Sequence, residues 1–259
     1  GSSALFVAAF LEAGLQAQSA PVRAIKILKP VEVRDGAAVA RLEPADMLEI
    51  DFRIDFADAA IGVQEKALNM ANGAFVRELS DSRTFCRNAE VIAMRERGLA
   101  LGGTLENAVV FEGDKVLSPG GLRHADEPVR HKMLDALGDL ALAGGPILGR
   151  YIGIRAGHAL TNRLLRALFA DPTAWQLVEC SAQTVGKLPG VGVHRVEHAE
   201  LVRVTGGVRH QLLDAEVRHP QVEVQRRAHA HGRQVGRAVA AGAHLVHRRE
   251  IGDAAQVGD

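Results

Sequence analysis

One helical pattern, at residues 126–145, constrains the fold more than any other part of the chain. At about 3.6 residues per turn, one side of this helix carries apolar residues, namely Val129, Met133, Leu137 and Leu140. The other side carries one imidazole and two carboxylates, from His131, Asp135 and Asp139. The apolar side needs a second layer of structure to cover it, because such helices are stabilised mainly by burial of that stripe. The polar side lacks the Lys–Glu pairs of a solvated helix and indicates a metal or acid–base site.

The second layer is predicted by strand-like runs at 22–33, 37–44 and 47–56. The run at 47–56 alternates apolar and polar residues, and Asp35-Gly36 is typical of a hairpin turn. Two more strands are predicted at 108–113 and 147–157, and helices at 4–13, 74–79, 89–98 and 158–170. Ser3 can cap the first of these helices. Because strands and helices mix without strict βαβ alternation, we expect an α+β fold.

The overall composition excludes several classes of protein. The chain has 31 basic and 31 acidic residues, so no net field attracts nucleic acid or an anionic membrane. No apolar run approaches the roughly 20 residues that span a bilayer, so we expect no transmembrane segment. The two cysteines imply no disulfide framework and favour a reducing, cytoplasmic location.

The composition changes after Trp175. From residue 176 to 259 there is no Phe, Tyr or Trp, and Lys187 is the only lysine. This segment fits either a small mobile domain or GC-rich nucleotide sequence read in a wrong frame. We favour the second interpretation, because a globular domain normally needs aromatic residues in its core. The motifs at 194–198 and 229–231 imitate metal spacing, but this composition argues against a real site there.

His131 and Asp135 lie at positions i and i+4, a spacing that lets two side chains of one helix bind the same ion. The alternative is a His–Asp salt bridge on the helix surface, and the spacing alone leaves both open. Lys132 lies between them and is either a solvated lysine or a cation that faces a substrate.

Four other positions carry candidate chemistry. His158 begins a predicted helix directly after a strand. Spacing alone predicts that His158 is a third zinc ligand, and the alternative is that it is a helix-terminal residue without a function. Asp139 is either a surface carboxylate or the partner that orients an imidazole, for which His158 is the obvious candidate. Thr84 offers a hydroxyl for an oxyanion or merely caps a turn. Gly102-Gly103 permits close approach of the backbone to a ligand.

Four motifs occur together in the chain: SRTF (82–85), LALGGTLENAVV (99–110), GLRHADEPVRHKMLDALGDL (121–140) and AGHALTNRLLRAL (156–168). In this order and spacing they resemble the UDP-3-O-acyl-N-acetylglucosamine deacetylase family, and the resemblance covers residues 1 to about 178. The family consists of zinc amidases that catalyse the committed step of lipid A synthesis in Gram-negative bacteria. The HKxLDxxGD and GHAL elements are highly specific for it.

The resemblance implies a domain organisation. The family has two similar α+β domains, each a two-layer sandwich of a sheet with packed helices, and the active site lies between them. Residues 1–20 then correspond to the last helix of the first domain and a linker. Residues 21–178 correspond to the whole second, zinc-binding domain. Residues 179–259 match nothing in the family, and we expect a disordered or frame-shifted tail.

The resemblance also implies roles for individual residues. His131 and Asp135 match zinc (Zn²⁺) ligands. His158 matches the general acid for the leaving amine rather than a ligand, and Asp139 matches the residue that orients it. Thr84 matches the hydroxyl that helps to stabilise the tetrahedral oxyanion. The positions that match substrate contacts are Lys132, Phe85 and Gly103.

Two departures from the family qualify these expectations. Cys86 and Arg87 stand where the family usually has Gly and Phe, which affects an acyl-chain contact. The family's third zinc-binding histidine and its general-base glutamate belong to the first domain, so we expect an N-terminally truncated, monomeric deacetylase with impaired activity. The alternative is a catalytically inactive module that binds a nucleotide sugar or a partner.

Overall fold

The structure is a computed structural model that describes residues 2–14 and 20–190. The predicted linker lies largely outside the described residues, and so does the predicted tail from residue 191 onward, including the two motifs that imitate metal spacing.

A seven-stranded mixed sheet forms one layer. Its strands are β1 (Arg23–Ile27), β2 (Val31–Asp35), β3 (Ala38–Pro44), β4 (Leu48–Asp55), β5 (Val63–Asn69), β9 (Ile147–Ile154) and β10 (Trp175–Glu179). Strand β9 is central, because it pairs in parallel with β1 and β4 and antiparallel with β3. The β2–β3 hairpin turns at Asp35-Gly36, as predicted, and Gly36 has a φ of 56°.

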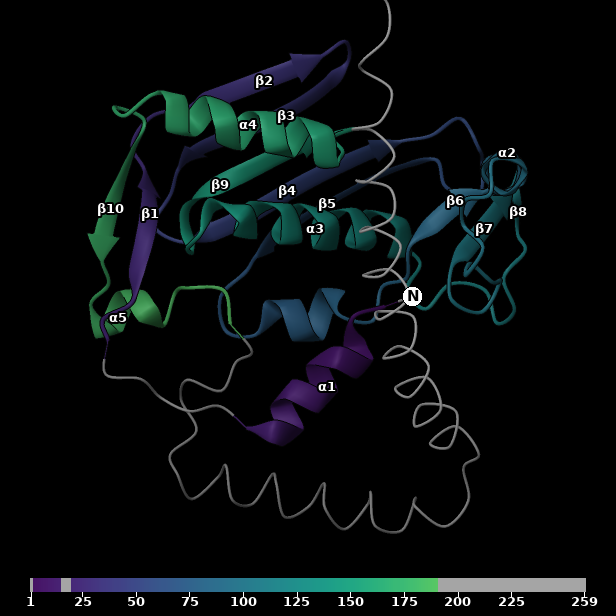
Figure 1. Cartoon of the computed structure of the whole chain (residues 1–259), viewed down its shortest axis with the longest axis horizontal. Helices are drawn as coiled ribbons and strands as arrows, with labels where there is room; N and C mark the ends of the chain where they lie inside the picture. The colour runs from purple at the N-terminus through teal and green to yellow at the C-terminus, as the bar shows by residue number, and fades with distance from the viewer. Residues whose placement is uncertain (1, 15–19, 191–259) are drawn as a thin grey trace, which may run out of the picture. The chain divides into compact units, whose positions relative to one another are not determined.

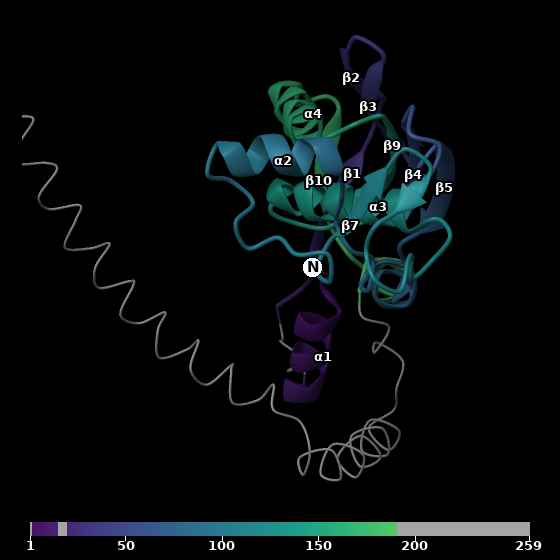
Figure 2. The same cartoon turned by 90° about the vertical axis from the view of Figure 1, so that its right-hand side faces the viewer.

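The helices α3 (Glu127–Leu140) and α4 (His158–Ala170) form the second layer. Figure 1 shows α4 against β2 and β3 and α3 beside β4 and β5, and in Figure 2 the strands β3, β4, β5 and β9 stand to the right of α4. The predicted apolar side of α3 is indeed buried at Val129, Met133 and Leu140, and Leu137 packs against the core. Strand β4 buries the predicted alternating residues Leu48, Ile50, Phe52 and Ile54. The α+β class and the two-layer arrangement are therefore confirmed.

A smaller, three-stranded sheet lies next to the start of α3. It contains β6 (Phe85–Arg87), β7 (Val109–Glu112) and β8 (Lys115–Val116), and α2 (Asn88–Glu96) follows β6 directly. The Val109 N–H donates to the Thr84 carbonyl at 2.8 Å, which holds the SRTF segment against β7. A short π-helix at Phe75–Leu79 precedes that segment and matches the helix predicted at 74–79.

The structure corrects three local predictions. The run at 22–33 is not one strand, because Pro30 has no N–H to donate and the chain turns there between β1 and β2. Strands β5, β6, β8 and β10 were not predicted; β10 pairs with β1, which lies about 150 residues earlier in the chain. Ser3 makes no side-chain cap on α1 (Ala4–Ala13); its hydroxyl instead donates to the Ser80 carbonyl at 2.8 Å.

Ordered structure continues past the predicted domain end at residue 178. Ser181 caps the short helix α5 (Ala182–Val185), and Leu188 packs with Ala24 and Leu148. None of the described helices is both long and apolar enough to cross a membrane.

Candidate metal and acid–base site

His131 lies in the second turn of α3 with its side chain largely buried. Its Nδ1 lies 3.3 Å from the Ser82 carbonyl oxygen, which is an acceptor, so this contact is a hydrogen bond in the tautomer that carries the proton on Nδ1. Its Nε2 lies 3.3 Å from Oδ1 of Asp135, one turn further along the helix. Burial lowers the pKa of the His131 imidazole, and the charge of Asp135 opposes that shift only in part. Burial therefore favours the neutral imidazole, the form that binds metals.

Asp135 is the point where three cationic or imidazole groups converge. Its Oδ2 accepts from the Lys132 ammonium at 2.8 Å and lies 3.8 Å from Nε2 of His158. Lys132 is therefore not a solvated lysine, since its side chain is mostly buried and paired.

His158 is the first residue of α4 and directly follows the turn after β9. Its Nδ1 lies 2.9 Å from both carboxylate oxygens of Asp139, and its side chain is 67% exposed while that of Asp139 is 17% exposed. The carboxylate thus fixes the ring through Nδ1 and leaves Nε2 free. The elements α3, β9 and α4 follow one another in the chain and together set this geometry.

A pocket of about 290 Å³ lies beside His131 and Asp135. Its lining residues are Phe56, Thr84, Phe85, Cys86, Arg87, Glu90, His131, Lys132 and Asp135. The predicted residues Thr84, Phe85 and Lys132 are thus brought together with the two predicted metal ligands. Gly103 is not among the lining residues; its carbonyl accepts from the Arg95 guanidinium at 3.0 Å.

Phe85 forms an aromatic wall of this pocket. Its ring makes edge contacts with Phe56, Phe111 and His131, with centroid separations of 5.5, 6.2 and 6.4 Å. These contacts restrict the rotation of the His131 ring as well as that of Phe85. Burial, with a smaller contribution from Glu90, raises the pKa of the neighbouring Cys86 thiol.

Arg83 and Glu127 form a buried ion pair that was not predicted from the sequence. The Glu127 side chain is fully buried, and its carboxylate accepts from Nε and Nη2 of Arg83 at 2.9 and 3.0 Å. It also accepts from the backbone N–H groups of Arg83 at 2.9 Å and Arg123 at 2.7 Å. These bonds outweigh burial and hold the pKa of Glu127 below its usual range. Its only sequence signal was an acidic residue in the first turn of a helix, which usually indicates a helix-dipole contact.

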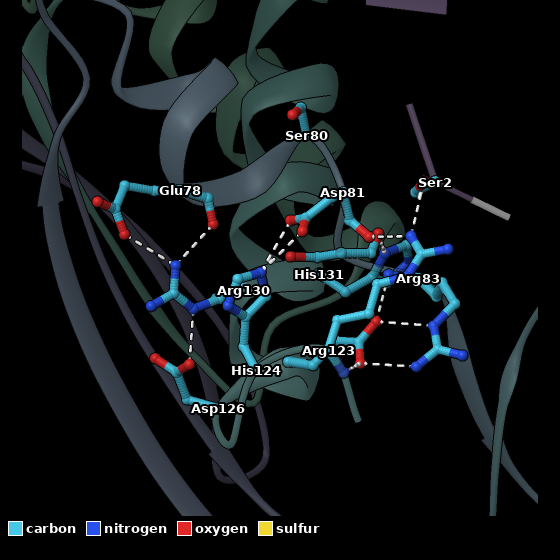
Figure 3. A network of polar contacts seen from close by, with 12 residues as sticks. Ser2, Glu78, Ser80, Asp81, Arg83, Arg123, His124, Asp126, Arg130 and His131 are labelled. Atoms are coloured by element: carbon cyan, nitrogen blue, oxygen red, sulfur yellow. Dashed lines mark hydrogen bonds and ion pairs between the residues drawn. The ribbon is translucent and has the colours of Figure 1, made fainter. Parts of the chain in front are cut away.

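Other polar contacts surround this pair (Figure 3). Arg130 donates to Asp126 at 2.6 Å and to the Glu78 carboxylate at 2.8 Å. His124 lies 2.9 Å from the Asp81 carboxylate. These contacts join the start of α3 to the segment before SRTF.

The His131–Asp135 pair fits a zinc ion. Two ligands about 2.0–2.1 Å from a tetrahedral zinc lie about 3.3–3.4 Å apart, and the Nε2–Oδ1 distance is 3.3 Å. The Nδ1 bond to Ser82 directs the lone pair of Nε2 toward this position. Within residues 2–14 and 20–190, no group of three or more His, Cys, Asp or Glu residues could hold a metal ion.

Comparison with known proteins identifies the family. A sequence model of the UDP-3-O-acyl N-acetylglycosamine deacetylase family matches residues 1–170. The chain belongs to this family. A relative from Phenylobacterium zucineum (strain HLK1), named UDP-3-O-acyl-N-acetylglucosamine deacetylase, is 52% identical over 177 residues, 68% of this chain and 60% of the relative. Relatives of the same name from Xanthomonas axonopodis pv. citri (strain 306) and Stenotrophomonas maltophilia (strain K279a) are 47% and 46% identical over 180 residues, 69% of this chain and 59% of each relative.

The resemblance stated from the four motifs is thus confirmed. The chain spans about three fifths of the length of these deacetylase relatives.

Proposed function

We propose that this chain carries the second-domain part of a zinc-dependent deacetylase. The reaction is hydrolysis of the acetamide of UDP-3-O-acyl-N-acetylglucosamine to the free amine and acetate, the committed step of lipid A biosynthesis. The observation that supports it is the proximity of the His131–Asp135 pair, which lines the pocket, to the His158–Asp139 pair, with Nε2 of His158 3.8 Å from Asp135. Membership in the deacetylase family makes this chemistry the natural assignment.

His131 and Asp135 would hold the zinc ion through Nε2 and a carboxylate oxygen. When bound, zinc lowers the pKa of its water to about 7 and polarises a carbonyl oxygen. The Thr84 hydroxyl is exposed at the pocket and would donate a hydrogen bond to the oxygen that becomes negative in the tetrahedral intermediate. Phe85, Lys132 and Gly103 would contact the substrate.

His158 would act as the general acid. Asp139 accepts from Nδ1 and stabilises the charged imidazolium, so the transferable proton is the one on Nε2. As the C–N bond breaks, this proton goes to the amine nitrogen, and the bond electrons stay with that nitrogen. The 3.8 Å separation between Nε2 of His158 and Asp135, a proposed metal ligand, supports this role.

We further propose that residues 1–259 alone have low activity, acting as a cytoplasmic monomer that binds no nucleic acid. The described residues offer two metal donors, whereas catalytic zinc sites normally use three protein ligands. The test is an assay of purified 1–259 with added zinc and the UDP-sugar. Turnover as fast as that of the Phenylobacterium zucineum relative would contradict the proposed impairment.

A chimera tests the site itself. The chimera is the Phenylobacterium zucineum relative with its matching segment replaced by residues 21–178 of this chain. We expect it to deacetylate the substrate, and we expect His131→Ala to abolish zinc binding and activity. His124→Gln is the matched control, because His124 also pairs with a carboxylate but does not line the pocket. Equal activity of the His131→Ala chimera and its parent would refute the proposal.

The second candidate is a catalytically inactive module that binds a nucleotide sugar or a partner. The lack of a three-ligand cluster among the described residues favours it. Zinc stoichiometry separates the two candidates: one tightly bound zinc per chain that is lost in His131→Ala favours the enzyme. Binding of the UDP-sugar that is indifferent to zinc and to this substitution favours the module.

A further inference from the structure

The peptide unit between Ser82 and Arg83 is hydrogen-bonded at both ends. Its N–H, on Arg83, donates to Oε1 of Glu127 at 2.9 Å. Its carbonyl oxygen, on Ser82, accepts from Nδ1 of His131 at 3.3 Å. A single peptide plane therefore connects a buried carboxylate to the imidazole that faces the pocket.

This peptide is held rigidly. The Glu127 side chain is fully buried, and its two oxygens accept four hydrogen bonds, three from Arg83 and one from the Arg123 N–H. The Arg83 guanidinium also donates to the Gly121 carbonyl at 2.7 Å. Rotation of the peptide would break the bond from its N–H to this buried carboxylate, which the other bonds hold in place, so the direction of the Ser82 carbonyl is restrained.

We infer that Glu127 is a positioning residue for His131 and acts through the Ser82–Arg83 peptide. A carboxylate that accepts from a peptide N–H polarises that peptide and makes its carbonyl a better acceptor. The Ser82 carbonyl then selects the tautomer of His131 with the proton on Nδ1 and leaves the Nε2 lone pair directed at Asp135. Metal-binding histidines commonly donate to a carboxylate directly; here one peptide unit is inserted between them. The consequence for zinc rests on the proposed function.

A competing arrangement makes this inference testable. The two ring nitrogens of His131 each lie 3.3 Å from an acceptor: Nδ1 from the Ser82 carbonyl oxygen and Nε2 from Oδ1 of Asp135. Without the polarised peptide, Asp135 would attract the proton to Nε2, and the lone pair would point at Ser82. The tautomer of His131 in the metal-free protein therefore reports on Glu127.

The first experiment uses metal-free wild-type 1–259 at pH 8, where an ordinary imidazole is neutral. Nitrogen-15 NMR of the imidazole groups distinguishes the two tautomers, and the His131 signals are assigned by their loss in His131→Gln. We expect the proton on Nδ1. A predominant Nε2–H tautomer would overturn the inference, and this measurement requires no variant of Glu127 to fold.

The second experiment compares Glu127→Gln, Arg83→Lys and Asp126→Asn. Glu127→Gln keeps an acceptor but loses the charge, so we expect a larger Nε2–H population. Arg83→Lys keeps the backbone N–H that donates to Glu127. Asp126→Asn changes the residue next to Glu127 and its contacts with Arg130 and Lys66, but it leaves the Ser82–Arg83 peptide unchanged. Both should retain the wild-type tautomer. An equal shift in all three variants would show a general loss of packing and contradict the inference.

Zinc affinity gives an independent result. With Zn²⁺ alone in a chelator competition, we expect Glu127→Gln to bind about 10- to 100-fold more weakly than wild type, as for other residues that orient a metal ligand. Asp126→Asn should bind as wild type does, and equal affinities of Glu127→Gln and Asp126→Asn would count against the role of Glu127. If the wild type binds no zinc, the proposed metal site fails, while the tautomer still decides the inference about Glu127.

Discussion

The two halves of α3 differ in the burial and hydrogen bonding of their polar side chains. At its first residue, Glu127 is fully buried and all of its bonds are made inside the protein. One to three turns later, the side chains of His131, Asp135 and Asp139 stay partly exposed and lie at or beside a pocket. The first half is closed by bonds inside the protein, whereas in the second half the imidazoles of His131 and His158 pair with carboxylates at the protein surface, and His131 and Asp135 line the pocket.

Desolvation explains the difference. A buried ion loses several kcal/mol of hydration, so it persists only where the protein replaces each lost hydrogen bond. A site that binds a metal or a substrate must instead keep some groups without internal partners. The first half supplies the rigidity, through the Ser82–Arg83 peptide, that the second half cannot supply for itself.

The largest expected effect is a loss of activity on substitution of His158, which pairs with Asp139 in the second half of α3. In the chimera, His158→Ala should lower kcat by about 10²–10⁴-fold, because a general acid contributes that much to the rate. Steady-state kinetics measure this loss, and zinc content should not change, since His158 is not proposed as a ligand. A loss of zinc in this variant would return His158 to the ligand role that spacing alone predicted.

In the first half the expected effect is on stability. Glu127→Ala should lower the free energy of unfolding of 1–259 by about 3–5 kcal/mol, because it leaves the buried charge of Arg83 without a partner. Urea denaturation measures the change. The control is Glu65→Ala, which removes a solvent-exposed pair with Arg53 and should cost less than about 1 kcal/mol. Similar losses in both variants would mean that the buried Arg83–Glu127 pair stabilises the fold no more than an exposed ion pair does.

A smaller effect is expected for the orienting carboxylate. Asp139→Asn should lower kcat of the chimera by about 10- to 100-fold while leaving KM and zinc affinity nearly unchanged. The reason is that the amide cannot stabilise the imidazolium of His158 through Nδ1. Unchanged kcat would show that the Asp139–His158 contact has no part in the reaction.

The smallest effect is a dependence of stability on pH. The pKa of Glu127 is lowered in the folded state, so its ionised form stabilises the fold fully above the unfolded value of about 4.3. This contribution is lost as the pH falls from there through the folded pKa. Urea midpoints between pH 6 and pH 3 should therefore fall less steeply for Glu127→Gln than for wild type. Parallel curves would indicate that Glu127 has no shifted pKa.

The sequence predicted those parts of the fold that repeat a local period. The amphipathic period revealed α3, and the alternation at Leu48 to Ile54 revealed β4. Strand β5 carries few apolar residues and β10 pairs with a strand from the other end of the domain, so neither has a sufficient local signal.

In the candidate site, too, local spacing identified some residues, whereas other contacts depend on the folded chain. Helical spacing identified His131 and Asp135, because both lie on one element. The contact between His158 and Asp139 was expected from their residue types and from the resemblance, but its geometry depends on how β9 returns the chain to α3. Helical spacing could not reveal the Arg83–Glu127 pair, whose members come from separate segments and meet only in the folded core.

The central position of β9 has a consequence for how the chain is made. Its partners β1, β3 and β4 are complete by Asp55, but β9 begins only at Ile147. At a synthesis rate of about 5–20 residues per second, the first strands wait on the order of 5–20 s for the strand that joins them. During that interval β4 lacks its β9 partner, and α3, which packs against β4, is complete only at Leu140. We therefore expect the nascent chain to depend on chaperones until residue 154 has left the exit tunnel.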